Sequence, residues 1–220
     1  MWRKSTVVRT LPNKMSCGTD GISYKLVKEA GHGVVGPLTS LFNHSLRLRR
    51  ISEEWKNAVG TPIFGGGPKD RHHPTTYRPI SLTSCAARIM EKLLNAQILE
   101  YLQSTSLRYK HQSGFLPRHS TVTQLCYLMH KWLMAIDQGN HVQATFLDLS
   151  KAYDRVSPPG LLFKLSSMGF SPFALECRSS WLSSKSGNPQ GTVLGPVPFL
   201  FTLMIYQPFL QLKVPFLPTT

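Results

Sequence analysis

Acidic residues are scarce in this sequence. Its 220 residues include 11 Asp and Glu against 25 Lys and Arg, which gives a formal net charge of +14 at pH 7. Such an excess of positive charge favours a polyanionic partner, most often a nucleic acid, or an anionic membrane surface. Apolar residues still make up 41% of the chain, so it is able to bury a core and is not a disordered polycation. Its length indicates one or two modest domains.

A membrane-spanning stretch and a secretion signal are also missing. A spanning helix needs about 20 mostly apolar residues, and the longest uncharged apolar stretch, residues 197–212, is interrupted by Pro198 and Pro208. The basic N-terminus has no apolar segment behind it, so we predict no signal peptide. We therefore expect no membrane association and an intracellular location, nuclear or cytoplasmic, rather than secretion.

Paired cysteines are absent as well. No Cys-x-x-Cys pair occurs among the four cysteines, which are Cys17, Cys85, Cys126 and Cys177. This scatter indicates free thiols in a reducing compartment and argues against a structural zinc site. We expect the four side chains to act as small core residues.

Apolar residues recur at helical spacing in four segments. Thr83 or Ser84 is the expected N-cap of the second helix, and Ser120 or Thr121 that of the third. The apolar face of the third helix, including Met129 and Trp132, is expected to lie in the core. The four predicted helices run from Gly36 to Arg50, from the N-cap at Thr83 or Ser84 to Tyr101, from Thr121 to the glycine at 139, and from Pro159 to Met168.

The intervening segments predict a hairpin and a strand. Glycine and proline punctuate residues 60–76, which we interpret as a loop or hairpin tip made basic by lysine, arginine and two histidines. Residues 143–149 are rich in apolar and β-compatible side chains and predict a short strand between two helices. This layout favours an α/β or α+β fold.

Asp148 is the residue around which chemistry is concentrated. The predicted strand delivers this carboxylate at its C-terminal end, and a buried carboxylate is costly unless it is paired or bound to a cation. Capping of the next turn is the usual role of a lone aspartate at such a place. Tyr153 and Asp154 follow shortly after, in a strongly basic chain. A Mg²⁺ ion held beside substrate phosphates is therefore the alternative.

The segment around Asp148 reads Phe-Leu-Asp-Leu-Ser-Lys-Ala-Tyr-Asp-Arg-Val over residues 146–156, and residues 77–84 read Tyr-Arg-Pro-Ile-Ser-Leu-Thr-Ser. Both closely resemble motifs of the reverse transcriptases of non-LTR (LINE-type) retrotransposons, the first catalytic motif and the second fingers motif. Four further segments resemble motifs of the same family in the same order: 18–22, Trp55-Lys56 with 62–64, 112–125 and 186–196. The ordered set is far more specific than any single match.

This resemblance implies a right-hand polymerase. An N-terminal segment at 1–16 would precede helix-rich fingers at 17–140 and a partial palm at 141–197 with a small, incomplete antiparallel sheet. The implied activity is that of an RNA-directed DNA polymerase, which extends a DNA primer on an RNA template with deoxynucleoside triphosphates by two-metal nucleotidyl transfer using Mg²⁺.

The resemblance also assigns roles to single residues. Asp148 would be the catalytic carboxylate and would bind Mg²⁺ together with the Leu149 carbonyl. Tyr153 would exclude a ribose 2′-OH and so select deoxynucleotides. Four residues would contact the incoming nucleotide, namely Lys69, Arg78, Gln190 and Gly191. Without the resemblance, Arg78 would be interpreted as a solvated surface arginine and residues 190–191 as an ordinary turn. Tyr153 would be as consistent with packing in the core as with a role in the site.

The second carboxylate motif of the family, Ala-Asp-Asp, is absent from residues 1–220, and the only acid after Asp154 is Glu176. One carboxylate cannot hold two divalent ions against their mutual repulsion. We therefore expect a catalytically incompetent reverse transcriptase fragment. The alternative is a non-catalytic module that binds RNA or RNA–DNA duplex, or a degenerate translation product without function.

Residues 198–220 are interpreted as a frame-shifted tail. Moving the reading frame back by one nucleotide lets residues 217–220, Leu-Pro-Thr-Thr, spell Phe-Ala-Asp-Asp. This hypothesis requires the codons of Leu217, Pro218 and Thr219 all to end in G.

Overall fold

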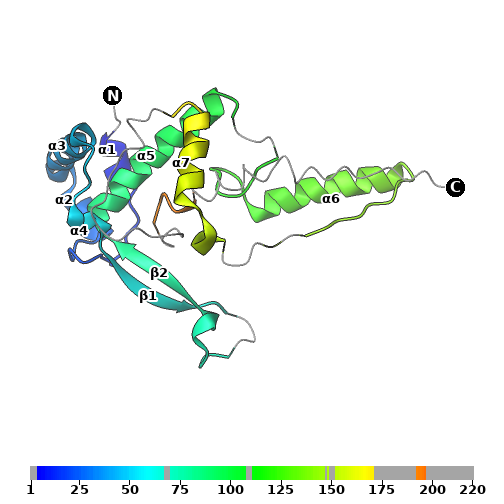
Figure 1. The fold of residues 1–220 in the computed structure, drawn as a ribbon, viewed down its shortest axis with the longest axis horizontal. Helices are drawn as coiled ribbons and strands as arrows, with labels where there is room; N and C mark the ends of the chain where they lie inside the picture. Colours follow the sequence, from blue (N-terminus) through cyan, green and yellow to red (C-terminus); the bar gives the residue numbers. More distant parts are fainter. Residues whose placement is uncertain are drawn as a thin grey trace.

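The computed structural model describes residues 4–66, 70–107, 111–146, 148, 152–170 and 192–196, with side chains from residue 7 onward. Helices dominate these residues, and one two-stranded sheet lies among them (Figure 1). The elements in chain order are α1 (Lys4–Arg9), α2 (Tyr24–Ala30), α3 (His32–Leu48), α4 (Glu53–Lys56), β1 (Ala58–Phe64), η1 (Pro74–Thr76), β2 (Tyr77–Thr83), α5 (Cys85–Ser104), α6 (Thr121–Asp137), η2 (Tyr153–Arg155) and α7 (Pro158–Ser167).

Helix α5 joins two apolar clusters. Its N-terminal half carries Cys85, Ile89 and Met90, which pack with side chains of α1, α2 and α3 such as Phe42. Its C-terminal end carries Leu102, which packs with Met168 just after α7. Figure 1 shows α5 running from the α1–α3 layer to α7. A single 20-residue helix, about 30 Å long at 1.5 Å per residue, thus connects the two apolar clusters.

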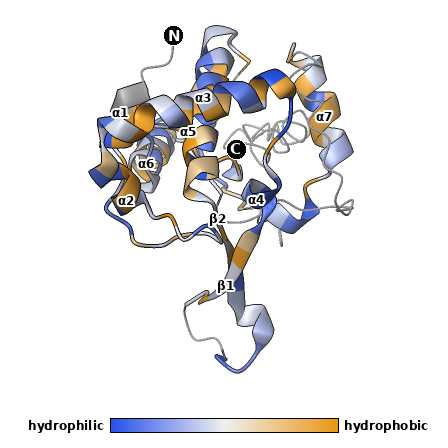
Figure 2. Ribbon diagram, turned by 90° about the vertical axis from the view of Figure 1, so that its left-hand side faces the viewer, coloured by the Kyte–Doolittle hydropathy of each residue, from blue (hydrophilic) through white to orange (hydrophobic). Residues whose placement is uncertain are grey.

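Strands β1 and β2 form an antiparallel hairpin that ends directly at α5. The register pairs Ala58 with Thr83 at the base and Phe64 with Tyr77 near the tip. The Phe64 and Tyr77 rings meet edge to face with centroids 5.6 Å apart, an arrangement that stabilises a cross-strand pair. Most of β1 is exposed, and the hairpin projects from the helical body (Figure 2). The hairpin expected for residues 60–76 is confirmed, with its first five residues belonging to strand β1.

The predicted helices are present, and the first one differs at its start. Helix α3 begins at His32, four residues before the expected Gly36, so that Pro37 lies inside the helix rather than in its first turn. Proline lacks the N–H that would bond back to residue 33, which lies one turn earlier. The extra turn is retained because Val34 and Val35 pack against the apolar cluster at the N-terminal half of α5.

The other three helices agree closely with the sequence. Ser84 is the N-cap of α5, which continues three residues beyond Tyr101. Ser120 and Thr123 form a capping box at the start of α6, and Gly139, two residues past its end, has φ +77°, a conformation that stops a helix. Helix α7 is offset from its predicted range by one residue at each end.

The expectation that the face of α6 lies in the core is wrong for the described residues. Helix α6 has no buried residue, Met129 is 49% exposed and Trp132 is half-buried. Figure 1 shows the helix lying apart from the other helices. The apolar periodicity is real, but no described element packs on this face.

The expectation that the cysteines are core residues holds for one of the three that the structure describes. Cys85 is fully buried, Cys17 is half-buried and Cys126, on α6, is exposed. All three are free thiols, as predicted. Cys177 lies outside the described residues.

The predicted strand at 143–149 is not found among the described residues of that segment. Residues 143–146 and 148 have no strand assignment, and Phe146 is 80% exposed. A strand requires a partner for its backbone N–H and C=O groups, and the only sheet in the described ranges is β1–β2. The fold is thus α+β, with helices and one small antiparallel sheet. No helix in these ranges is both long enough and apolar enough to cross a bilayer.

Candidate functional site

The exposed hairpin carries Arg78, one of the predicted nucleotide-contacting residues. Arg78 lies on β2 opposite Ile63, one residue from the start of the strand, and its side chain is exposed. Its Nε lies 3.9 Å from the point that a Cβ at Gly65 would occupy. The guanidinium therefore lies at the tip end of the hairpin, where a planar cation can reach a phosphate group.

The tip beyond Arg78 is basic and internally hydrogen-bonded. The Arg71 guanidinium lies over the Phe64 ring, 5.0 Å from its centroid. Asp70 is the only acid between residues 65 and 76, and its Oδ1 accepts a hydrogen bond from the His72 N–H at 2.8 Å. The Asp70 carboxylate thus stabilises the turn, and Arg71 and Arg78 are the charged groups that the tip presents. Lys69 lies outside the described residues.

Asp148 and Tyr153 come from a different part of the chain. Asp148 is exposed and Tyr153 is half-buried. Burial raises the pKa of the Tyr153 hydroxyl above its usual range, so the phenol is neutral at physiological pH. Val156, 2% exposed, anchors this segment in the protein. No ion pair joins Asp148 and Arg78, both of which the structure describes.

The described residues do not by themselves form a donor set for a pair of Mg²⁺ ions. Within those ranges, no three His, Cys, Asp or Glu side chains gather at a spacing that could hold a metal ion. Asp148 is exposed rather than enclosed by other carboxylates. Leu149, whose carbonyl was expected to assist, lies outside the described residues. We therefore derive no catalytic step through a metal ion.

An acidic residue that the sequence analysis did not select joins two distant segments. The Glu91 carboxylate, on α5, accepts hydrogen bonds from the backbone N–H groups of Val193 at 2.7 Å and Leu194 at 3.3 Å. Burial raises the pKa of Glu91, although these hydrogen bonds and the Arg88 charge oppose the shift. The available signal was an acid inside an apolar stripe, since Ile89, Met90, Leu93 and Leu94 surround it in the sequence. Gln190 and Gly191, just before the bound segment, lie outside the described residues.

The motif at residues 18–22 packs against the junction of β2 and α5. Cys17 and Ser23 form an isolated antiparallel bridge, which closes residues 18–22 into a turn. A second contact joins the same regions, because the Arg88 guanidinium donates to the Ser16 carbonyl at 3.3 Å and lies over the Tyr24 ring. The N-terminal segment is thereby fixed to the helix that follows Arg78 in the chain.

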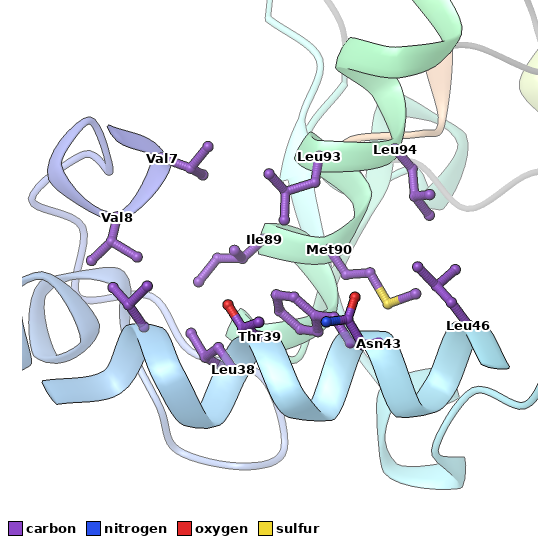
Figure 3. Close-up of a pocket in the computed structure, with 12 residues that line it drawn as sticks. Val7, Val8, Leu38, Thr39, Asn43, Leu46, Ile89, Met90, Leu93 and Leu94 are labelled. Carbon is purple, nitrogen blue, oxygen red and sulfur yellow. The ribbon is translucent and has the colours of Figure 1, made fainter. Parts of the chain in front are cut away.

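A small cavity between α1, α3 and α5 lies within the apolar cluster at the N-terminal half of α5. It has a volume of about 30 Å³, and only Thr39 and Asn43 among its lining residues are polar. Figure 3 shows Val8, Ile89 and Met90 facing this space. Its size corresponds to a packing gap between helices, far below the roughly 300 Å³ at which ligand pockets begin. It is not a candidate nucleotide site.

Comparisons with known proteins show which proteins the chain is similar to. Residues 67–215 match the family described as "Reverse transcriptase (RNA-dependent DNA polymerase)". The chain is 30% identical over 206 residues to "Probable RNA-directed DNA polymerase from transposon BS" and over 207 residues to the corresponding protein from transposon X-element, both of Drosophila melanogaster. It is also 30% identical over 206 residues to "RNA-directed DNA polymerase from mobile element jockey" of Drosophila funebris. These alignments cover 86%, 87% and 86% of this chain but 23%, 23% and 22% of the three relatives, so the chain spans about a quarter of their length.

Proposed function

The chain belongs to the reverse transcriptase (RNA-dependent DNA polymerase) family, in its non-LTR retrotransposon branch, and we propose that residues 1–220 form the nucleic-acid-binding fingers and part of the palm of such a domain. Residues 17–140 are the fingers in this proposal and 141–197 the partial palm. The partners are an RNA template, a DNA primer and deoxynucleoside triphosphates. The proposed location is inside the cell, in the nucleus or cytoplasm.

The observation that carries this proposal is the exposed, basic β1–β2 hairpin inside a matched family region. The match begins at residue 67 and includes the tip of the hairpin and all of β2. Arg71 and Arg78 present two guanidinium groups there, and the single acid of the tip is bonded to its own turn. Guanidinium groups bind phosphate oxygens through two parallel hydrogen bonds, and an overall charge of +14 attracts a polyanion over a longer range.

The remaining roles follow the family motifs. Asp148 and Leu149 are the proposed metal-binding positions, Tyr153 the residue that selects deoxynucleotides, and Lys69 a second cation for the triphosphate. Gln190 and Gly191 are the proposed contacts to the nucleotide and the template–primer. All of these positions except Lys69 lie in segments that resemble family motifs, and the assignments rest on that resemblance.

We further propose that residues 1–220 bind nucleic acid without catalysing polymerisation by themselves. The second pair of carboxylates is absent from their sequence, and the described residues contain no cluster able to hold a metal ion. Binding by the hairpin does not need these carboxylates, because phosphate contacts are electrostatic and independent of a metal pair. A binding role is therefore compatible with the loss of catalysis.

Binding is tested with an RNA–DNA primer–template and the whole chain over a series of salt concentrations. Affinity should fall linearly with salt on logarithmic axes, and Arg78→Gln should weaken binding and reduce the slope by about 1, the value for one lost phosphate contact. Arg47→Gln, which removes an exposed arginine of α3, is the matched control and should leave the slope unchanged. Equal effects of the two variants, or no binding by the wild-type chain, would refute the assignment of the hairpin.

Catalysis is tested by primer extension with Mg²⁺ and deoxynucleoside triphosphates. We expect no extended product from the polypeptide of residues 1–220. A template-dependent product that disappears in Asp148→Ala would overturn the proposal that this chain is inactive and would assign catalysis to Asp148.

A further inference from the structure

Glu91 lies on α5 at a place where its carboxylate is costly. The side chain is half-buried, and the chain contains only 11 acids in total. Removal from water raises the pKa of Glu91, and the hydrogen bonds and the nearby Arg88 charge only partly offset this effect. An apolar residue would pack at this place without that penalty. The stability of the helix alone therefore does not explain why an acid occupies this position.

The hydrogen bonds of Glu91 supply such a reason. Oε2 accepts from both Val193 and Leu194, two successive backbone N–H groups that are 102 and 103 residues away in the chain. Leu194 also packs with Leu102 and Met168 in the second apolar cluster. The segment at 192–196 is thus fixed to α5 by a polar contact and by an apolar contact.

The position of this segment along α5 links it to the hairpin. Glu91 lies six residues after Cys85, where α5 begins, which is about 9 Å along the helix axis. Cys85 is separated from β2 by Ser84 alone. One continuous helix therefore sets the spacing between the strand that carries Arg78 and the segment that Glu91 holds.

We infer that Glu91 is a positioning residue whose carboxylate holds the backbone of residues 192–196 on α5, and so fixes this segment relative to the strand that carries Arg78. These residues form the C-terminal end of the segment at 186–196 that resembles a family motif. This inference rests on the proposed function for its nucleotide part.

The test compares Glu91→Ala and Glu91→Gln with Glu100→Ala in the whole chain. Glu100 is the matched control, since it is a glutamate of the same helix with an exposed side chain. Both bonds of Glu91 end on one oxygen, so the glutamine carbonyl is able to accept both of them. Glu91→Gln is therefore the conservative variant that keeps the anchor and removes the charge, and it is expected to fold if the alanine variant does not.

The first readout is hydrogen exchange at the Val193 and Leu194 amides. We expect Glu91→Ala to speed exchange at these two amides by about tenfold, the factor that corresponds to one lost charge-assisted hydrogen bond. Glu91→Gln should retain most of the protection, and Glu100→Ala should match the wild type. Unchanged exchange at both amides in Glu91→Ala would overturn the anchor.

The second readout is the affinity of the chain–duplex complex for a fluorescent deoxynucleoside triphosphate. Glu91→Ala should weaken triphosphate binding several-fold and leave duplex binding unchanged, and Glu91→Gln should restore it. Faster amide exchange with unchanged triphosphate affinity would overturn the positioning role while leaving the proposed function intact. A wild-type chain that binds neither duplex nor triphosphate would refute the proposed function and, with it, the nucleotide part of the inference.

Discussion

Substituting Gly18 by alanine should destabilise the protein through the junction of β2 and α5. An added Cβ would lie 2.6 Å from the Thr83 carbonyl carbon and 2.7 Å from both the Thr83 oxygen and the Ser84 nitrogen. All three are backbone atoms at a place where Thr83 and Ser84 are 6% and 1% exposed. No flexible side chain can give way, so one backbone segment has to move relative to the other.

The size of the effect follows from that displacement. Real Cβ atoms essentially never approach a heavy atom closer than 3.0 Å, so the two segments must separate by at least 0.4 Å. Insertion of a methyl group into a packed region typically lowers the free energy of unfolding by about 1–3 kcal/mol. The same movement would also pull on the Cys17–Ser23 bridge, so we expect a value in the upper half of this range.

Gly33→Ala is the matched control for this substitution. Gly33 lies in the first turn of α3, and a Cβ there meets nothing within 4 Å. Alanine in a helix is favoured over glycine by up to about 1 kcal/mol, so this variant should be as stable as the wild type or more stable. Urea denaturation followed by far-ultraviolet circular dichroism measures both variants. A Gly18→Ala variant that unfolds within about 0.5 kcal/mol of the wild type, a difference typical of neutral surface substitutions, would refute the close packing of Gly18 on the junction of β2 and α5.

Two further predictions concern the second cluster and the cysteines. Tyr101→Phe removes the hydroxyl that donates to the Met168 carbonyl at 2.8 Å, and it should lower the free energy of unfolding by about 1 kcal/mol; an unchanged urea midpoint would contradict the contribution of this bond. Iodoacetamide at pH 8 should modify Cys126 in the folded protein and leave Cys85 unmodified, because burial raises the pKa of the Cys85 thiol to about 11. Peptide mass spectrometry locates the label, and modification of Cys85 before unfolding would contradict its burial.

Local signals explain which parts of the fold could be predicted from the sequence. The start of α6 is encoded within four residues, since Ser120 and Thr123 each satisfy a backbone N–H of the other, and its end is marked by a glycine. The hairpin is encoded similarly by the glycines and prolines between two β-compatible runs. The start of α3 was misplaced because proline is tolerated best in a first turn, whereas packing of Val34 and Val35 on the core extends this helix further back.

Non-local contacts explain what the sequence did not reveal. The apolar run that includes Phe146 has strand composition, but a strand also needs a partner strand, and its described residues pair with none. The stripe on α6 likewise specifies a helix face and not the surface that covers it. Glu91 was overlooked for the same reason, because its two partners lie about one hundred residues further along the chain.

The family motifs predicted which residues bear chemistry, whereas the structure shows what holds some of them in place, and α5 is the common support. It follows directly after β2, the strand of Arg78, and it binds residues 193 and 194 through Glu91. The turn at Gly18 lies in close contact with Thr83 and Ser84, the two residues that precede α5. These three attachments are covalent, steric and hydrogen-bonded, so they respond to different substitutions. A change at Gly18 or Glu91 can therefore alter the geometry of the proposed nucleotide site while Arg78 and Asp148 remain unchanged. Loss of binding in such a variant would come from a change in how α5 and its attached segments are positioned, because the groups that contact the phosphates would be unchanged.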